Sequence, residues 1–397
     1  MTAHSTLGAS SAYRWMACPG SVQLIGRAPA GPPSAYAAEG TAAHTLAEQC
    51  LLGGHDAEEF IGRMIDDFEV NEDMATAVQV YLNIVRSLEF MAGSTVREVE
   101  VSIDLRSLHP DLWGTGDLVL YTASSKTLHV PDYKHGKGVP VEVAGNPQLR
   151  YYALGAYMAL KDKWPIEKVM IGVVQPRAPH RDGPVRWEEV TPTELVLFGE
   201  ELVRAARATE APDAPLKAGD HCRFCSAQAV CPALRDRSLS VAQDEFGSSP
   251  AVEQLTADQL GTILTRIDML DSWVRAVEEH ALARLRAGER IPGWKLVDKR
   301  ATRKWKEDRV IAPELAKLGL VAEQIWVTEL RSPAAVEKFL PAPRRKELVP
   351  LIDKVSSGTT IAPESDKRPA VQSGPVLDFA PANTVEQTSP VADLFGN

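Results

Sequence analysis

Apolar positions recur at helical spacing through most of the first ninety residues. The stretch YAAEGTAAHTLAEQCLL is rich in Ala, Leu and Glu, and MATAVQVYLNIVRSLEFM repeats apolar residues at the three- and four-residue intervals of a helix. An acidic connection, GGHDAEEFIGRMIDDFEV, separates the two stretches. The pattern therefore predicts a helical N-terminal part that spans residues 1–95.

From Val96 the pattern changes to short β-type runs. VREVEVSI, GDLVLYT and TLHVPDYK each favour a strand, and the polar ASSK between the last two predicts the turn of a hairpin. A helical stretch, NPQLRYYALGAYMALKDK, and a further strand, KVMIGVVQP, follow. Strands followed by a helix and another strand predict an α/β fold, with a mixed sheet flanked by helices. We expect this core, with a cysteine-rich segment at its end, at residues 96–236.

The last third of the chain has a different character. Residues 237–355 combine helical runs with basic residues and predict a small helical and basic C-terminal module. Residues 356–397 are rich in Pro, Ser, Thr and Ala, which predicts a disordered tail. The total of 397 residues agrees with a core plus an extension, because single cores rarely grow beyond about 250–300 residues.

The composition excludes several classes of protein. A hydrophobic content of 44% and a charged content of 24% are typical of globular proteins. The net charge of −10 argues against nucleic-acid binding through bulk positive charge, although a local basic groove remains compatible with it. No apolar run approaches the roughly 18–20 residues that span a bilayer, and the N-terminus does not resemble a signal peptide. We therefore expect a cytoplasmic protein with no membrane partner.

Two carboxylates and a lysine stand at the ends of the predicted hairpin strands. Asp117 opens one strand, and Asp132 and Lys134 close the next. Residues 132 and 134 share one side of an extended strand, and the hairpin can bring Asp117 near them. Such a set suits Mg²⁺ or Mn²⁺, which would activate water, while Lys134 orients that water or neutralises a phosphate. Taken singly, the three residues are equally compatible with a turn, a strand end and a solvated charge.

Three of the five cysteines are clustered. Cys222, Cys225 and Cys231 form a C-x2-C-x5-C pattern, and in a reducing compartment such clusters are more often metal ligands or redox groups than disulfides. The spacing alone is equally compatible with zinc and with an iron–sulfur cluster. Cys50, on a predicted helix, is expected to be a small buried apolar residue.

Four short motifs occur in the order seen in the RecB-like branch of the PD-(D/E)XK nucleases, a branch that includes the nuclease domain of AddB and CRISPR-associated nucleases. The chain resembles this branch through GTAAH, GTGD, DYK and QLRYY. The resemblance implies a restriction-endonuclease-like fold. It also implies a role for each residue in these motifs. The metal site would be made by His44, Asp117, Asp132 and the backbone carbonyl of Tyr133. Lys134 would be catalytic, and Gln148 and Tyr152 would lie near the DNA.

The same resemblance extends to the cysteines. Nucleases of the AddB type carry one cysteine before the core and three after it, and together these hold a 4Fe-4S cluster. RWMACPGS supplies the early residue, Cys18, so the resemblance implies a clasp made by Cys18, Cys222, Cys225 and Cys231. Structural zinc is the alternative occupant. A closure of about 200 residues would stabilise the fold by restricting the unfolded chain.

Several phrases, among them YRWMACPGS, DYKHGKG and CRFCSAQAVCPA, are similar to a phage- and prophage-encoded DUF2800-like group within this superfamily. The superfamily resemblance implies a metal-dependent deoxyribonuclease, expected to be an exonuclease on single-stranded or duplex DNA ends in phage recombination or replication. Phage recombination or replication proteins are its implied partners, and the absence of a Walker A motif places any helicase on another protein. A catalytically silent DNA-binding or scaffold protein with the same fold is the alternative.

Two C-terminal features are candidates for binding. Arg303, Lys304 and Trp305 lie in KRATRKWKEDR, which could follow a phosphate backbone and stack a base, or could be a solvated face with one packed tryptophan. The tail segment VADLF, residues 391–395, is similar to peptides that dock on the bacterial sliding clamp, although it lacks their leading glutamine.

Overall fold

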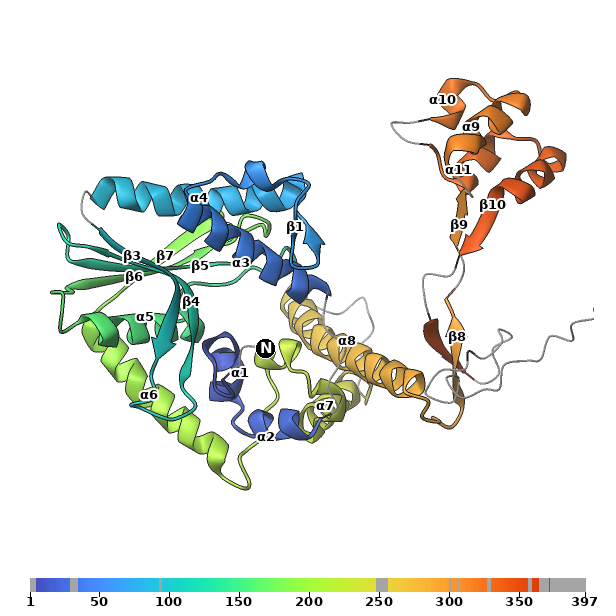
Figure 1. Cartoon of the computed structure of the whole chain (residues 1–397). Coiled ribbons are helices and arrows are strands. Elements are labelled where there is room, and N and C mark those ends of the chain that lie inside the picture. Colours follow the sequence, from blue (N-terminus) through green and yellow to red (C-terminus); the bar gives the residue numbers. More distant parts are fainter. Residues whose placement is uncertain are drawn as a thin grey trace, which may run out of the picture. The chain divides into compact units, whose positions relative to one another are not determined.

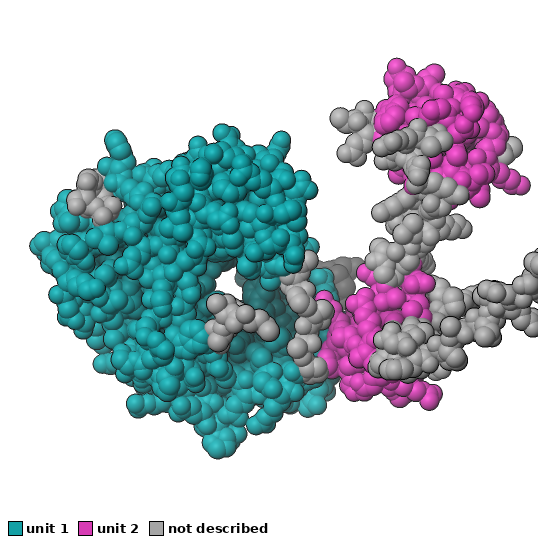
Figure 2. Space-filling view, viewed as in Figure 1, with its two compact units in different colours: residues 1–276 teal, residues 277–397 magenta. Residues whose placement is uncertain are grey.

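We describe the protein from a computed structural model. It divides into two compact units, unit 1 at Met1–Ala276 and unit 2 at Val277–Asn397, which Figure 2 shows in different colours. The predicted clamp-docking segment lies outside the described residues. The structure describes residues 5–28, 35–92, 95–247, 256–299, 302–305, 308–326, 330–355, 359–363 and 371.

The N-terminal part of unit 1 contains the two predicted helices. They are α3 and α4, and the acidic connection between them includes a small hairpin, β1–β2, that the sequence pattern did not predict. The hairpin reverses at Asp66, whose φ of +51° belongs to a tight turn. The elements of this part are η1 Ala9–Ser11, α1 Ala12–Ala17, α2 Gly20–Arg27, α3 Ala35–Gly53, η2 Ala57–Phe60, β1 Met64–Ile65, β2 Phe68–Glu69 and α4 Glu72–Ala92.

A five-stranded mixed sheet forms the centre of unit 1. The strand pattern predicted a mixed sheet and four of its strands, but not the last one, β7. The strand order is β3-β4-β5-β6-β7, and every neighbouring pair is antiparallel except β5 and β6. Helix α5 connects the parallel pair, because parallel strands require a crossover. The elements are β3 Thr95–Asp104, β4 Trp113–Thr122, β5 Thr127–Tyr133, α5 Pro147–Leu160, β6 Lys168–Val174, β7 Val185–Val190 and α6 Pro192–Glu210.

Helices cover both faces of this sheet (Figure 1). On β4, Val119 and Tyr121 pack in the cluster that contains residues of α5 and α6, whereas Leu118 and Leu120 pack with α3 and α4. This alternation is the period-two pattern of a strand that is buried on both sides. The sheet therefore sits between two apolar layers, and the candidate site lies where β4 and β5 approach α3.

The alternation breaks at one level of the sheet. On β3, Val99 packs with the α3–α4 cluster, but Val101, two residues later, packs with the α5–α6 cluster. Between them Glu100 has a φ of +50°, which is uncommon for a residue other than glycine. On β4, Gly116 lies beside Tyr152 of α5, whereas Leu118 is on the opposite face of the sheet, with the α3–α4 cluster. Both strands thus exchange faces at the level of Glu100.

The C-terminal segments of unit 1 pack against its N-terminal helix α2. A Cβ at Gly20 would lie 2.3 Å from the carbonyl oxygen of Ala214, so the close packing of α2 against this segment requires glycine. Leu24 of α2 also packs against a small cluster that includes Cys222, Cys231 and Leu234. The elements are η3 Asp220–Phe224, η4 Gln228–Val230, α7 Pro232–Gly247 and α8 Ala257–Arg286.

Unit 2 has its own core around Leu315 and Leu348. Strand β8 pairs with β11, and β9 pairs with β10. Part of the predicted disordered tail is thus a strand, and most of the rest of that tail lies outside the described residues. The elements are β8 Trp294–Asp298, β9 Thr302–Trp305, α9 Asp308–Lys317, α10 Ala322–Ile325, α11 Pro333–Val336, η6 Glu337–Phe339, η7 Ala342–Leu351, β10 Ile352–Val355 and β11 Thr359–Pro363.

Among the described residues, no helix combines the length and apolar character needed to cross a bilayer.

Candidate functional site

The predicted hairpin of β4 and β5 brings the motif residues together. Its paired register runs from Thr122 opposite Thr127 to Leu120 opposite His129. Beyond that point the backbone N–H of Tyr133 donates a 2.7 Å hydrogen bond to Oδ2 of Asp117. The carboxylate of Asp117 thereby joins the two strands at the open end of the hairpin.

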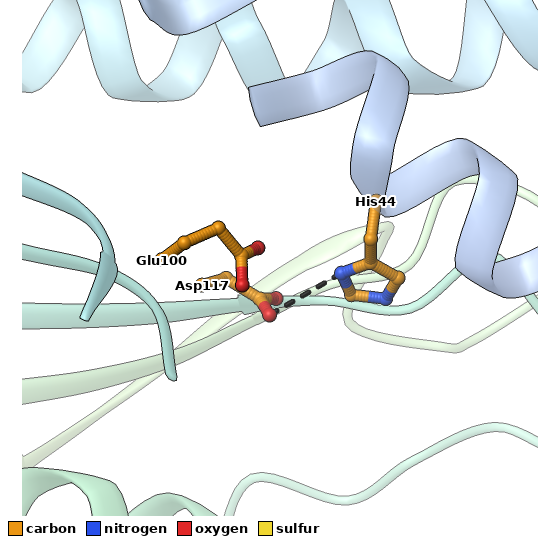
Figure 3. A group of neighbouring side chains, drawn as sticks. All are labelled: His44, Glu100 and Asp117. Carbon is orange, nitrogen blue, oxygen red and sulfur yellow. Dashed lines mark ion pairs between the residues drawn. The ribbon is translucent and has the colours of Figure 1, made fainter. Parts of the chain in front are cut away.

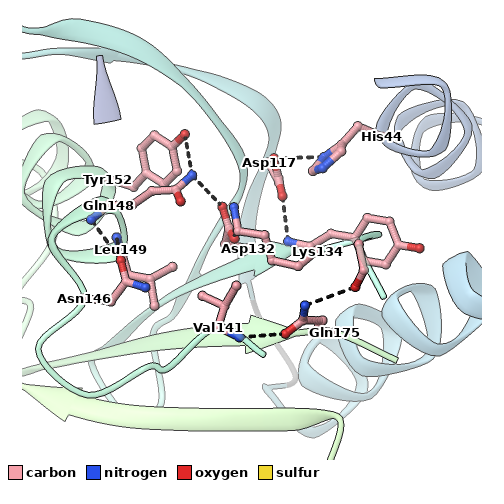
Figure 4. Close-up of polar contacts among 12 residues, drawn as sticks. His44, Asp117, Asp132, Lys134, Val141, Asn146, Gln148, Leu149, Tyr152 and Gln175 are labelled. Carbon is pink, nitrogen blue, oxygen red and sulfur yellow. Dashed lines mark hydrogen bonds and ion pairs between the residues drawn. The ribbon is translucent and has the colours of Figure 1, made fainter. Parts of the chain in front are cut away.

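His44 reaches the same carboxylate from α3. Its Nδ1 lies 3.2 Å from Oδ1 of Asp117, and its ring packs edge-on against the buried ring of Tyr133, with 5.4 Å between centroids (Figure 4). Burial opposes the charged form of His44, but the neighbouring Asp117 carboxylate outweighs it and raises the pKa of His44. Burial likewise opposes ionisation of Asp117, yet His44 holds its pKa below the ordinary value. A charged pair is therefore favoured at this position.

Asp132, on β5, and Lys134, directly after β5, form the second half of the site. Lys134 Nζ lies 2.7 Å from Oδ2 of Asp132, whose side chain is only 3% exposed. Gln148 of α5 donates from Nε2 to Oδ1 of Asp132 at 3.3 Å and to the hydroxyl oxygen of Tyr152 at 3.2 Å (Figure 4). Burial raises the pKa of Asp132 although Lys134 opposes this. The predicted proximity of Asp117, Asp132 and Lys134 is confirmed as geometry.

The donor set of these residues fits a divalent cation. Oδ2 of Asp132 is buried and, beyond its ion pair with Lys134, has no hydrogen-bond partner. Buried carboxylates need compensating positive charge, and a cation bound by carboxylate oxygens and an imidazole nitrogen provides it. His44 and Asp117 are therefore suitable ligands. Asp132 is not in the group of residues whose ligand atoms lie within 4.8 Å of one another, so its role as a ligand, like that of the backbone carbonyl of Tyr133, remains a prediction.

Sequence reasoning missed Glu100. It lies on β3 at the level of Asp117 on β4, because the flanking pairs are Val99 with Leu118 and Val101 with Gly116. One ligand atom from each of His44, Glu100 and Asp117 lies within 4.8 Å of the other two (Figure 3). Burial and the charge of Asp117 raise the pKa of Glu100 to about 7. The run VREVEVSI contains both Glu98 and Glu100, and nothing in its pattern marks one of them as a site residue. Only the pairing register of β3 with β4 could have shown that Glu100 lies beside Asp117.

A second missed residue is Arg177, which follows β6. Its side chain is 7% exposed, and its guanidinium pairs at 2.9 Å with both Glu39 of α3 and Asp73 of α4. It also contacts the ring of His135, the residue after Lys134. Burial, followed by the charge of Arg177, lowers the pKa of His135 to about 4. Arg177 therefore connects the helix that carries His44 with the segment that carries Lys134.

Replacing Arg177 with Ala is expected to reduce the free energy of unfolding by about 1–3 kcal/mol, because the partly buried Glu39 carboxylate loses its main cation. Lys137 also pairs with Asp73, at 3.1 Å, but is 60% exposed, so Lys137→Ala should cost less than about 1 kcal/mol. Urea denaturation of both variants measures the difference. Equal stability of the two variants would contradict the proposed connection.

All four predicted clasp cysteines line one small cavity in unit 1. Cys18 comes from the end of α1, and Cys222, Cys225 and Cys231 come from the segment around η3 and η4. The backbone N–H of Lys217 donates to Sγ of Cys18 at 3.2 Å. The structure thus brings together cysteines that are about 200 residues apart, and a metal or cluster held by them remains a prediction.

Charged groups also face this cavity. Arg14 and His221 line it, and hydrogen bonds to Cys18 and Cys222 raise the pKa of His221 to about 10. Burial raises the pKa of the Cys18 thiol, but the bond with His221 outweighs this and lowers it. A cationic imidazole favours the thiolate of Cys18, which is the form that binds metals, whereas burial raises the pKa of the Cys225 and Cys231 thiols. Cys50 lies elsewhere, fully buried among apolar residues of α3 and α4, as expected.

The predicted DNA-binding residues are in two places. Gln148 and Tyr152 lie at the site, but Tyr152 is buried and supports Gln148. Arg303, Lys304 and Trp305 lie on β9 of unit 2, where the Arg303 and Lys304 side chains are outside the described part. The Trp305 indole packs on the unit 2 core and donates to the carbonyl oxygen of Arg331 at 2.6 Å. This packing favours the structural interpretation of Trp305 over base stacking.

The fold and the site together define an α/β protein with a mixed sheet, two covering helical layers and a cluster of groups suited to a divalent cation. A family model described as "Protein of unknown function (DUF2800)" matches residues 4–369. The chain therefore belongs to the DUF2800 family.

Proposed function

We propose that the protein is a metal-dependent DNA nuclease with a restriction-endonuclease-like fold of the PD-(D/E)XK kind. The observation that carries the proposal is the convergence of His44, Asp117, Asp132 and Lys134 from one helix and two strands. Each motif alone is weak, but their convergence at one edge of the sheet supports a common chemical role. The expected reaction is phosphodiester hydrolysis by an activated water.

The residues divide this work between them. His44, Asp117, Asp132 and the carbonyl of Tyr133 would hold Mg²⁺ or Mn²⁺, which when bound supplies a nucleophilic water and stabilises charge on the phosphate. Lys134, oriented by its ion pair with Asp132, donates to the attacking water or to a phosphate oxygen.

Gln148 and Tyr152 position this pair. Gln148 fixes the Asp132 carboxylate by donating to Oδ1, and the buried hydroxyl of Tyr152 lies against the Gln148 amide. Mutation of such supporting residues typically weakens metal binding or activity by about 10–100-fold.

The proposals for the substrate and for the cysteine clasp rest on the resemblance to the RecB-like PD-(D/E)XK nucleases. We propose an exonuclease that acts on single-stranded or duplex DNA ends, alongside phage recombination or replication proteins. The cavity lined by Cys18, Cys222, Cys225 and Cys231 supports a 4Fe-4S cluster, with structural zinc as the alternative. The cluster would join the two ends of unit 1, and catalysis would remain at the carboxylate site.

The proposal is tested by incubating the purified protein with Mn²⁺ and end-labelled single-stranded DNA. Cleavage by the parent protein is expected, with a loss of at least about 100-fold in Asp132→Ala, because the variant lacks a ligand and the anchor of Lys134. Asp162→Ala removes an exposed carboxylate at the end of α5 and is expected to cleave like the parent. Absence of cleavage by the parent with Mg²⁺ and Mn²⁺, or equal cleavage by Asp132→Ala, would instead favour a non-catalytic DNA-binding scaffold.

A further inference from the structure

Glu100 belongs to none of the motifs that define the proposed site. It comes from β3, a strand that the motif comparison leaves out, yet its carboxylate approaches both His44 and Asp117 (Figure 3). The three residues belong to three different elements, α3, β3 and β4, so their convergence comes from the tertiary fold. Two carboxylates and an imidazole in this arrangement offer one nitrogen and several oxygen donors.

The backbone of β3 directs Glu100 to this position. A regular strand would keep Val99 and Val101 on the same face, but here they pack on opposite faces of the sheet. The exchange takes place at Glu100, through its positive φ. Conformations of this kind persist where the surrounding structure imposes them, and they occur often at functional sites.

The local charges also call for a cation. Glu100 and Asp117 are adjacent carboxylates, and two negative charges this close repel each other, so either a proton on one carboxylate or a cation between the two relieves the repulsion. The ammonium group of Lys134 is engaged by Asp132 at 2.7 Å, so its charge is already shared with another carboxylate. His44 supplies at most one positive charge to two carboxylates.

We propose that Glu100 is a further ligand of the divalent cation held by His44 and Asp117. The inference rests on the proposed metal site and adds to it a carboxylate that the motif set does not include. The imidazole nitrogen favours Mn²⁺ over Mg²⁺, because Mg²⁺ prefers a shell of oxygen ligands.

The test measures Mn²⁺ binding to the full-length protein in the absence of DNA, by isothermal titration calorimetry and by electron paramagnetic resonance of free Mn²⁺. Glu100→Gln is expected to weaken binding by at least about 10-fold, since even partners that only orient metal ligands are worth about 10–100-fold. Glu98→Gln, an exposed position two residues earlier on β3, should bind Mn²⁺ like the parent protein.

Glu100→Gln is nearly isosteric and removes a repulsion, so its thermal midpoint without metal should equal or exceed that of the parent. Added Mn²⁺ should raise the midpoint of the parent but not that of Glu100→Gln, because a ligand stabilises only the state that binds it. Should Glu100→Gln fold poorly, Glu100→Asp keeps the carboxylate and should bind Mn²⁺ measurably.

The outcomes separate the two proposals. Unchanged Mn²⁺ affinity in Glu100→Gln, or no Mn²⁺ binding by the parent, would overturn the role of Glu100. Mn²⁺ binding that depends on Glu100, in a protein that cleaves no DNA, would retain this inference and refute the nuclease proposal. DNA cleavage by the parent with unchanged Mn²⁺ binding in Glu100→Gln would retain the nuclease proposal and refute the role of Glu100.

Discussion

Asp117→Asn is expected to reduce the single-turnover rate of DNA cleavage by about 1000-fold or more while leaving the protein folded. Asp117 contacts His44 through one carboxylate oxygen and the β5 backbone through the other. Asparagine retains the shape of the side chain and one acceptor oxygen. It removes the negative charge that favours the protonated form of His44 and the binding of a cation. Charge stabilisation by a metal is worth several kcal/mol, and each 1.4 kcal/mol corresponds to about tenfold in rate.

The control for this variant is Asp111→Asn, which changes an exposed carboxylate in the connection between β3 and β4. It should cleave DNA at the rate of the parent. Circular dichroism of both variants checks that the sheet is intact. A folded Asp117→Asn protein that cleaves like Asp111→Asn would remove Asp117 from the proposed mechanism.

Cys18→Ser is expected to abolish binding of the metal or cluster proposed for the cysteine cavity and to release the N-terminal helices from the end of unit 1. Metal binding in small structural sites contributes about 10–16 kcal/mol of apparent free energy, which is comparable to the whole stability of a domain. The parent should be brown after anaerobic purification and contain iron, and Cys18→Ser should be colourless. Limited proteolysis should then cut residues 212–231, which the parent protects.

Cys50→Ala provides the matched control, because Cys50 is also fully buried but lies among apolar side chains away from the cavity. It should retain the metal and the protease protection. A parent protein with stoichiometric zinc and no iron would replace the iron–sulfur assignment with the structural zinc alternative. Unchanged metal content in Cys18→Ser would exclude Cys18 as a ligand.

The periodic parts of the fold could be predicted from the sequence. Helix α3 follows from its content of Ala, Leu and Glu, helix α4 follows from apolar spacing, and the β4–β5 hairpin follows from two β-rich runs around a polar turn. The proximity of Asp117, Asp132 and Lys134 followed as well, since a hairpin and a two-residue spacing determine it. These features depend on neighbours in the chain or across one turn.

The missed features depend on tertiary geometry. Glu100 approaches Asp117 because β3 exchanges faces, and no local pattern distinguishes it from Glu98. Arg177 connects α3, α4 and the segment after Lys134, which are distant in sequence, so its spacing carries no signal. For Trp305 the sequence left base stacking and a packed indole open, and the packing of the indole against the unit 2 core favours the second interpretation.

The cysteine cavity also has a consequence for biosynthesis. Cys18 is translated first, and Cys231 follows about 200 residues later, so at about 5–20 residues per second the ribosome needs about 10–40 s to deliver the remaining ligands. During much of that interval α2 lacks part of its final packing, because Gly20 and Leu24 pack against segments around Ala214 and Cys222 that are still to be made. The cysteine cavity is therefore expected to close only after synthesis of Cys231, and α2 in a nascent chain stalled before residue 212 should be more sensitive to protease than α2 in the full-length chain.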